Sequence, residues 1–346
     1  MNPYLNKVIQ VIDEHIASIN PKMKWMWGEA LFGYALLKLD EYLNDTKYAS
    51  FIESYLNYYL AHPPKVDQSD TFAPILISHT YDQIYQCHTY QSLTQRGLDY
   101  FLNTKPVIDF LPNHLGHSLV GKFYPRSIWV DSIMMYGVFL SVYGKDTKQE
   151  TYTNLSYETV MKFQDYLEHD GLWTHAYLTR KRKAYPNGIY WGRGNGWVMT
   201  ALPMIYKNLN QKQQQDILPI FQRTCQSIMK YQKKGLYQTI LNYPSMFESS
   251  ASLLINGGVL GGANLGLVSE DVAQIAKNGY EQTLDTFIKI KKGHLVLTRV
   301  SNPTIPMPIF PRMGYKYIGI KDNWSYGLAS LIFASIEYDS YINNSN

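Results

Sequence analysis

Asp131 is the residue whose surroundings best suit acid catalysis. It lies in the segment SIWVDSIMMYGVF, where most neighbours are apolar. An aspartate is rarely buried without a partner. A carboxyl group held there would lose hydration, which raises its pKa and lets it deliver a proton near neutral pH. The other interpretation is structural, because an aspartate at this place can be the N-cap of a helix over 132–142.

A second acid precedes another apolar helical segment. Asp70 lies in VDQSDTFAP, just before the apolar run that begins at Ala73. This residue is also a candidate helix cap. If the two helices are neighbours, both acids lie within reach of one substrate. Their separation would then decide which paired-carboxylate chemistry is open to them.

The heptad WGRGNGW, residues 191–197, is the most unusual segment of the chain. Its three glycines let the backbone bend tightly or approach a ligand closely. The glycine spacing does not fit a dinucleotide-binding loop, and no Gly-Lys-Ser/Thr end marks a phosphate-binding loop. Arg193 places a fixed cation among aromatic rings, which suits a carboxylate or a pair of sugar hydroxyls. A purely structural role for the heptad is the alternative.

Tryptophans gather at the starts of the apolar helical segments. Indole rings have a large apolar face and a polar edge, so a set of them at helix mouths predicts a sugar-binding cup. Filling of the core near helix ends is the competing explanation. His175, in GLWTHAYL, is either a cleft residue or a hydrogen-bonded structural histidine. The seven tryptophans are Trp25, Trp27, Trp129, Trp173, Trp191, Trp197 and Trp324.

Twelve helical segments of two alternating kinds must position these residues. Six are almost wholly apolar and contain small residues; they begin at Trp25, Ala73, Trp129, Trp191, Phe247 and Asn323. Six others place apolar residues at helical spacing on one face only. They cover 6–19, 48–60, 93–102, 154–167, 211–232 and 269–288. This alternation predicts an all-α (α/α)6 barrel, with six inner and six outer helices, as a single domain over residues 1–346.

Two loops stand out between these segments. The stretch 105–127 is long and contains three prolines, and 179–188 is basic and rich in turn residues. Long loops in a compact domain are usually functional or disordered. The alternating stretch 293–309 predicts a short hairpin.

Composition excludes several classes of protein. The 346 residues are 45% hydrophobic and 17% charged, which suits a sizeable core, and the net charge of +4 gives little support for nucleic-acid binding. No apolar run approaches the roughly 18 residues of a membrane span. The N-terminal segment reads as an amphipathic helix and not as a signal peptide. Two cysteines and the lack of an HExxH spacing argue against a zinc site. We expect a cytoplasmic protein without metal, cofactor, nucleic-acid or membrane partners.

Six segments of the chain resemble the unsaturated rhamnogalacturonyl hydrolases of glycoside hydrolase family 105. They span most of the chain in the expected order, and the heptad and the WVD element are the more specific of them. The segments are WGEALFGYALLKL at 27–39, DTFAP at 70–74, IWVDSIMM at 128–135, THAYL at 174–178, WGRGNGW at 191–197 and FESSAS at 247–252. The family's six-fold α/α barrel agrees with the repeat of helical segments.

The resemblance implies roles for individual residues. The family's catalytic acid matches Asp131, and its second active-site acid matches Asp70. One departure is Ile75, which stands where the family commonly has glycine. The implied substrate-binding residues are His175, Arg193, Trp197 and, in the long loop, Lys122; Trp27, Trp129 and Trp191 complete the predicted cup.

The resemblance also implies a mechanism. The substrate would be a small oligosaccharide with a 4,5-unsaturated uronic acid at its non-reducing end. Asp131 would protonate C4 of this enol ether, and water steered by Asp70 or His175 would add at C5. The resulting hemiketal opens and expels the next sugar. The charge of Arg193, and not the resemblance, makes it a candidate partner of the uronate carboxylate. Because such a hydration needs only an acid and a positioned water, no metal or cofactor is expected.

Two other functions fit an α/α toroid with this sequence. An epimerase or lyase acting on sugars would need a histidine pair or a Tyr/Arg base near the cup. A non-catalytic sugar-binding toroid would need the tryptophans but no acid.

Overall fold

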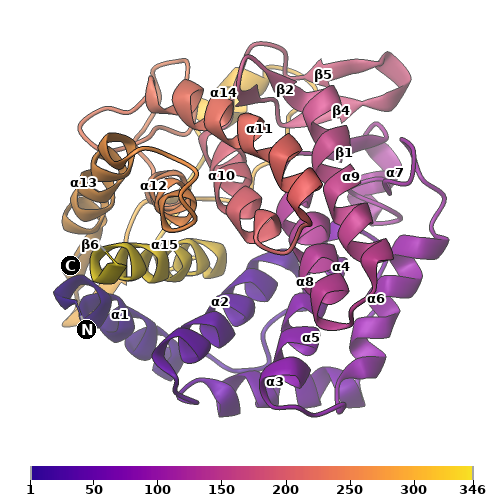
Figure 1. Ribbon diagram of the computed structural model, residues 1–346, viewed down its shortest axis with the longest axis horizontal. Coiled ribbons are helices and arrows are strands. Elements are labelled where there is room, and N and C mark those ends of the chain that lie inside the picture. Colours follow the sequence, from indigo (N-terminus) through magenta and orange to yellow (C-terminus); the bar gives the residue numbers. More distant parts are fainter. Residues whose placement is uncertain (1, 345–346) are drawn as a thin grey trace.

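Six inner helical segments form a closed ring in the computed structural model, which describes residues 2–344 (Figure 1). Each contacts the next, and the last contacts the first. The ring consists of α2 (Trp27–Leu43), α4 (Ser69–Phe72) with α5 (Ile75–Ile84), the π-helix η1 (Ile133–Gly137) with α8 (Val138–Asp146), α10 (Gly192–Tyr206), α12 (Ser249–Asn264) and α15 (Ser325–Asn344).

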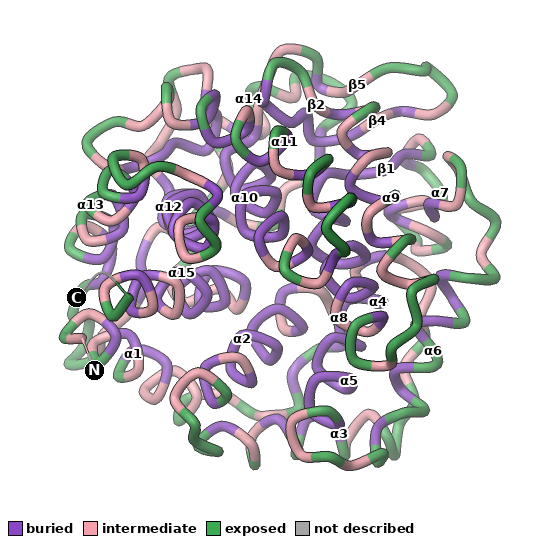
Figure 2. The backbone as a smooth tube through the Cα atoms, viewed as in Figure 1, coloured by how far each residue is buried: buried purple, intermediate pink, exposed green. Residues whose placement is uncertain are grey.

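Six outer helices surround this ring and alternate with the inner ones along the chain. In α11, for example, Ile217, Phe221 and Ile228 are buried on one face, whereas its glutamines are mostly partly or fully exposed. Figure 2 shows the same division, with buried inner helices and exposed outer surfaces. The outer helices are α1 (Pro3–Ser18), α3 (Ala49–Ala61), α6 (Gln91–Asn103), α9 (Glu150–Leu167), α11 (Gln211–Met229) and α13 (Glu270–Phe287). The predicted (α/α)6 barrel is therefore confirmed.

Glycines let some inner helices approach closely. A Cβ atom at Gly258 in α12 would lie 2.4 Å from the backbone carbon of Met199 in α10, and one at Gly257 would lie 2.6 Å from Cα of Ala334 in α15. Any larger residue would force these helices apart. The small residues of the apolar segments thus serve the packing of the ring.

Because inner and outer helices alternate, all six inner helices begin at the same end of the ring, which we call the mouth.

The loops contain short strands and helices, most of which the sequence analysis did not predict. The predicted hairpin lies earlier than expected, at β6 (Ile288–Lys291) and β7 (His294–Leu297), turning at Lys292 and Gly293. The other pairs are β2 (Glu168–His169) with β3 (Leu172–Trp173), and β8 (Val300–Ser301) with β9 (Ile320–Lys321). Three short helices are α7 (Leu119–Phe123), η2 (Thr179–Lys181) and α14 (Pro311–Lys316).

A three-stranded sheet at the mouth matters most for the site. It has the order β1 (Ser127–Trp129), β4 (Ala176–Leu178), β5 (Lys183–Tyr185). Trp129 pairs with Ala176, and the N–H of Val130 donates to the carbonyl of His175 at 2.8 Å. The sheet thereby fixes the loop that carries Asp131 against the loop that carries His175. Among residues 2–344, no helix is long and apolar enough to cross a membrane.

Candidate active site

The two predicted acids lie on either side of one imidazole ring at the mouth. Asp70 is the second residue of α4, and Asp131 lies in the turn that precedes η1. Oδ1 of Asp70 is 3.7 Å from Nε2 of His114, and Oδ1 of Asp131 is 4.0 Å from Nδ1 of the same ring. Neighbouring inner segments therefore bring both acids to one place, as the sequence suggested.

His114 is held by the residues next to the two acids. Its Nδ1 lies 2.8 Å from Oγ of Ser69 and 2.7 Å from Oγ of Ser132. The ring also stacks on Trp129, with centroids 4.1 Å apart. Ser69 precedes Asp70 and Ser132 follows Asp131, so His114 ties together the two turns that carry the acids.

Burial controls the protonation of this group of three residues. Loss of hydration raises the pKa of Asp131 to about 7, opposed by nearby backbone N–H groups and by the positive charge of Arg193. Burial also raises the pKa of Asp70 to about 8, and the charge of Asp131 adds to this effect. His114 is buried too, which lowers its pKa to about 3. The histidine is therefore neutral and forms no ion pair that would stabilise the carboxylates, despite the short distances.

Asp131 directly precedes helical Ser132, and backbone N–H groups of Asp131 and Ser132 donate to its carboxyl group. The N-cap of η1 is Ser132, one residue later, and Oδ1 of Asp131 is buried without a hydrogen-bond partner. A π-helix turn follows it directly, a form often found at functional sites. The position of Asp131 therefore fits both interpretations: its carboxyl group is desolvated, and it lies at the start of a helix.

Stability should fall with rising pH because both acids are buried. A raised native pKa stabilises the fold fully below the unfolded value of 3.8, and this contribution is lost as pH rises through the native values of about 7 and 8. We expect Asp70→Asn to lose less unfolding free energy between these pH values than the wild type. Each unit of difference between the native and the unfolded pKa of Asp70 corresponds to about 1.4 kcal/mol. Urea unfolding at pH 5 and pH 8 measures it. Equal pH dependence in the wild type and the variant would contradict the burial argument.

A continuous stack of aromatic rings lies beside the acids. Trp129 meets His175 edge-on at 5.1 Å, His175 stacks on Trp191 at 4.3 Å, and Trp191 stacks on Tyr315 of α14 at 6.4 Å. Nδ1 of His175 lies 2.8 Å from Oη of Tyr315, whereas Nε2 is buried without a partner. Burial lowers the pKa of His175 well below its usual value, so this histidine is also neutral.

A second aromatic group surrounds Trp27 at the start of α2. Trp27 is partly exposed, stacks on Tyr326 at 4.6 Å and meets Trp197 edge-on at 6.5 Å. Its ring also packs on Ala73 and Met135, from two other inner segments. Trp27 is therefore the predicted cup residue best placed to meet a ligand.

The other predicted cup tryptophans are largely covered. Trp129, Trp191 and Trp197 are buried, and their neighbours are histidines, Arg193 and other aromatic rings. In this structure they build the wall behind the mouth, as in the core-filling alternative. Direct stacking of a sugar on these three rings stays a prediction.

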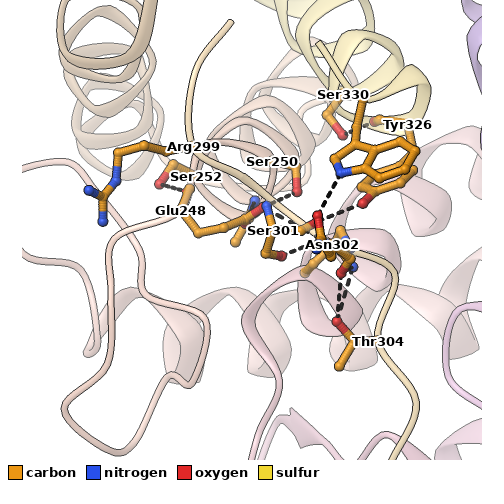
Figure 3. A network of polar contacts seen from close by, with 12 residues as sticks. Glu248, Ser250, Ser252, Arg299, Ser301, Asn302, Thr304, Tyr326 and Ser330 are labelled. Atoms are coloured by element: carbon orange, nitrogen blue, oxygen red, sulfur yellow. Dashed lines mark hydrogen bonds and ion pairs between the residues drawn. The ribbon is translucent and has the colours of Figure 1, made fainter. Parts of the chain in front are cut away.

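Arg193 is committed to contacts inside the protein. Its Nη1 donates to the carbonyl and hydroxyl oxygens of Ser301 and lies 3.6 Å from Oε1 of Glu248. Its Nη2 donates to the carbonyl of Asn302 at 3.0 Å and to Oγ1 of Thr304 at 3.4 Å. Figure 3 shows the network around Glu248, Ser301 and Asn302. The expected pairing with a substrate carboxylate would have to break several of these bonds, so the structure favours a structural role for Arg193.

Lys122 does not lie with the acids. It is exposed on α7 and lines a cleft with other cations on the outer side of the β1–β4 sheet. Its match to the family's cleft lysine is therefore not supported by its position.

Three residues of the site had no role in the sequence analysis. His114 was visible only as a histidine in a long loop, and Tyr315 and Glu248 reach the site from distant parts of the chain. Glu248 lies in the family-like segment FESSAS at 247–252, but no local pattern marks His114 or Tyr315, because their partners are brought together by the ring. Within residues 2–344, no group of three or more His, Cys, Asp and Glu side chains is placed to hold a metal ion.

A helical toroid with two buried acids and tryptophans at its mouth has the parts of a glycoside hydrolase, an enzyme class that acts through carboxyl groups. The chain belongs to glycosyl hydrolase family 88, whose model matches residues 4–342. A relative from Bacillus subtilis (strain 168), named unsaturated rhamnogalacturonyl hydrolase YesR, is 24% identical over 95% of both chains.

Solved structures share this fold. A possible member of family 105 from Salmonella enterica serovar Paratyphi A has a TM-score of 0.83 and 20% identity, covering 93% of this chain and 84% of the other. A family 105 glycoside hydrolase from C. acetobutylicum has a TM-score of 0.82 and 21% identity, covering 98% and 99%. These matches confirm the predicted resemblance and the toroid.

Proposed function

We propose that the enzyme removes a 4,5-unsaturated uronic acid from the non-reducing end of small oligosaccharides, with Asp131 as proton donor. The observation that carries this proposal is the pair of buried acids around a neutral histidine at the mouth. The name of the Bacillus subtilis relative supports an unsaturated galacturonyl group linked to rhamnose as the substrate.

The proposed reaction begins with protonation of carbon. Asp131, whose pKa of about 7 keeps a fraction protonated at neutral pH, transfers its proton to C4 of the enol ether. Positive charge develops at C5 and on the ring oxygen. Water attacks C5 and loses its proton to the carboxylate that Asp131 has become, while Asp70, mostly protonated because its pKa is about 8, is placed to steer the water. The hemiketal then opens to a ketone at C5, which leaves a hemiacetal at C1, and this hemiacetal collapses to an aldehyde and releases the next sugar as an alcohol.

The histidines and Tyr315 at the mouth do not supply the histidine pair or tyrosine base that an epimerase or lyase would need. Those enzymes need a base, and the two histidines at the mouth are poor bases because burial lowers the pKa of both His114 and His175. The phenol of Tyr315 is no better, since burial raises its pKa well above 10. The groups present are acids with raised pKa values.

The test uses the ultraviolet absorbance of the conjugated double bond. We expect an unsaturated galacturonyl-rhamnose disaccharide to lose this absorbance when the enzyme is added, while a saturated disaccharide of the same composition stays intact. A lyase would instead raise the absorbance of a saturated oligosaccharide. Binding of the unsaturated disaccharide without any loss of absorbance would contradict the proposal and favour the non-catalytic toroid.

A further inference from the structure

His114 has a fixed place between α4 and β1, although it lies in a long loop. Its backbone N–H donates to the carbonyl of Ser127 at 2.9 Å, and its carbonyl accepts from the N–H of Ser69 at 3.0 Å. The residue is 2% exposed, and its ring lies nearly parallel to that of Trp129, at an angle of 11°. The ring therefore has one orientation, in which its two nitrogens face different partners.

The contacts of Nδ1 indicate which nitrogen of His114 carries the ring proton. A neutral imidazole has one donor nitrogen and one acceptor nitrogen. The hydroxyl of Ser69 donates its only proton to the carbonyl of His114 at 2.9 Å, so its oxygen faces Nδ1 as an acceptor at 2.8 Å. The hydroxyl oxygen of Ser132, 2.7 Å from the same nitrogen, can accept as well. These contacts suit a proton on Nδ1, which leaves Nε2 as the acceptor.

Nε2 of His114 faces Asp70, which has a proton that this nitrogen can accept. Oδ1 of Asp70 is 3.7 Å from Nε2, and the side chain of Asp70 is 16% exposed. Burial raises the pKa of Asp70 to about 8, so this carboxyl group is mostly protonated at neutral pH. The distance is longer than a formed hydrogen bond, but hydrogen bonds between catalytic groups often tighten only when the substrate binds. Donor and acceptor therefore match across this gap.

We propose that His114 is a positioning residue for the proposed reaction: Nδ1 holds the two acid-bearing turns together, and Nε2 accepts a hydrogen bond that aims the carboxyl group of Asp70. The inference deepens the proposed function and rests on it. With its hydroxyl turned toward His114, Asp70 keeps a carbonyl oxygen that can accept a hydrogen bond from the attacking water. His114 itself neither touches the substrate nor transfers a proton.

A purely structural histidine would depend on the contacts of Nδ1 alone. Its ring would join the turns 69–70 and 131–132, and the group that faces Nε2 would not matter. Two substitutions separate these roles. The side-chain amide of His114→Asn lies close to the place of Nδ1 and does not reach Asp70, whereas the longer side chain of His114→Gln brings its amide close to the place of Nε2.

The first experiment compares kcat, KM and urea unfolding of these two variants. We expect kcat of His114→Asn to fall by about 10- to 100-fold, the effect of a small misplacement within a site, while KM stays nearly unchanged. His114→Gln should keep more activity, because its amide oxygen can accept from Asp70. It should also be the less stable of the two, because it loses the contacts with Ser69 and Ser132. The order of activity is therefore opposite to the order of stability.

His79→Asn is the matched control for these variants. His79 is also buried, and its Nε2 lies 2.9 Å from Oδ2 of Asp146. The two residues lie in the middle of α5 and at the end of α8, away from the mouth. This variant should be less stable than the wild type and keep its kcat. If kcat of the two His114 variants follows their stability, His114 only joins the turns and the inference is wrong.

Nitrogen NMR of the histidine rings tests the contact with Asp70 without turnover, the signals of His114 being those that His114→Asn lacks. At pH 6 we expect the wild type to carry the ring proton of His114 on Nδ1. The Nε2 signal should stay in place in Asp70→Asn, whose amide can still donate to it, and should move in Asp70→Leu, which has no donor. A ring proton on Nε2 in the wild type, or an unchanged Nε2 signal in Asp70→Leu, would overturn the inference. Failure of the wild type to act on the unsaturated disaccharide would contradict only the proposed function, because the spectra decide the contact independently.

Discussion

Replacing Asp131 with asparagine is expected to lower kcat by about 10²- to 10⁴-fold, the usual contribution of a positioned general acid. Asparagine keeps the size of the side chain but has no proton to give to carbon. The fold should survive, because the amide oxygen of asparagine can accept the backbone N–H groups of residues 131 and 132 that now donate to the carboxyl group. At pH 8 the variant should even be more stable than the wild type, since burial raises the pKa of Asp131 and so makes its ionised form costly.

The measurement combines initial rates, from the loss of ultraviolet absorbance, with urea unfolding of the same samples. Asp271→Asn is the matched control, because Asp271 is exposed on the outer helix α13. It should keep wild-type activity. An Asp131→Asn variant that is folded and nearly as active as the wild type would rule out Asp131 as the proton donor.

The kcat of the wild-type enzyme should fall as pH rises. A donor must hold its proton, so kcat should fall as pH rises through the pKa of about 7 of Asp131. Because the charge of one acid raises the pKa of the other, the two acids titrate as a coupled pair, and the profile reports the pair. In Asp70→Asn this fall should stay near the same pH, because the pKa of Asp70 is the higher of the two and Asp70 is therefore already neutral when Asp131 ionises.

The parts of the molecule that the sequence predicted share one property: their signal is local. The alternation of apolar and amphipathic segments identifies the ring, and an aspartate inside an apolar run identifies Asp131. Both depend on residues within a few turns of each other. The structure then adds only that neighbouring inner segments bring Asp70 and Asp131 to the same histidine.

The parts that the sequence missed depend on contacts between distant segments. Arg193 meets Ser301 across 108 positions, and His175 meets Tyr315 across 140. The sequence shows that the cation of Arg193 lies among aromatic residues, but nothing near Arg193 in the sequence shows that its partner is Glu248. Composition and spacing therefore show which residues are charged. Only the fold shows which of these charges are already paired within the protein.

Arg193 and Glu248 form a buried ion pair, and loss of the arginine should destabilise the fold strongly. Arg193 is 1% exposed and Glu248 is fully buried. Glu248 also accepts hydrogen bonds from the N–H groups of Ala251 and Ser301, at 2.5 and 3.0 Å. Arg193→Met would leave this carboxylate buried without its cation, and removal of one partner from such a pair typically costs about 3–5 kcal/mol.

The double variant Arg193→Met/Glu248→Gln tests whether the pair itself is responsible. It should recover part of the stability, because no charge is then left unpaired in the core, although the bonds to Ser301 and Asn302 stay broken. Lys162→Met is the matched control: its pair with Asp109 is exposed, so its removal should change little. Urea unfolding gives all four free energies.

The same variants show whether Arg193 has a structural or a substrate-binding role. The charge of Arg193 holds down the pKa of Asp131, so Arg193→Met should shift the fall of kcat to higher pH. A residue that binds only the substrate carboxylate would instead raise KM and leave unfolding and the pH profile unchanged. That second pattern would show that Arg193 turns from its internal partners to the substrate carboxylate, as its charge first suggested.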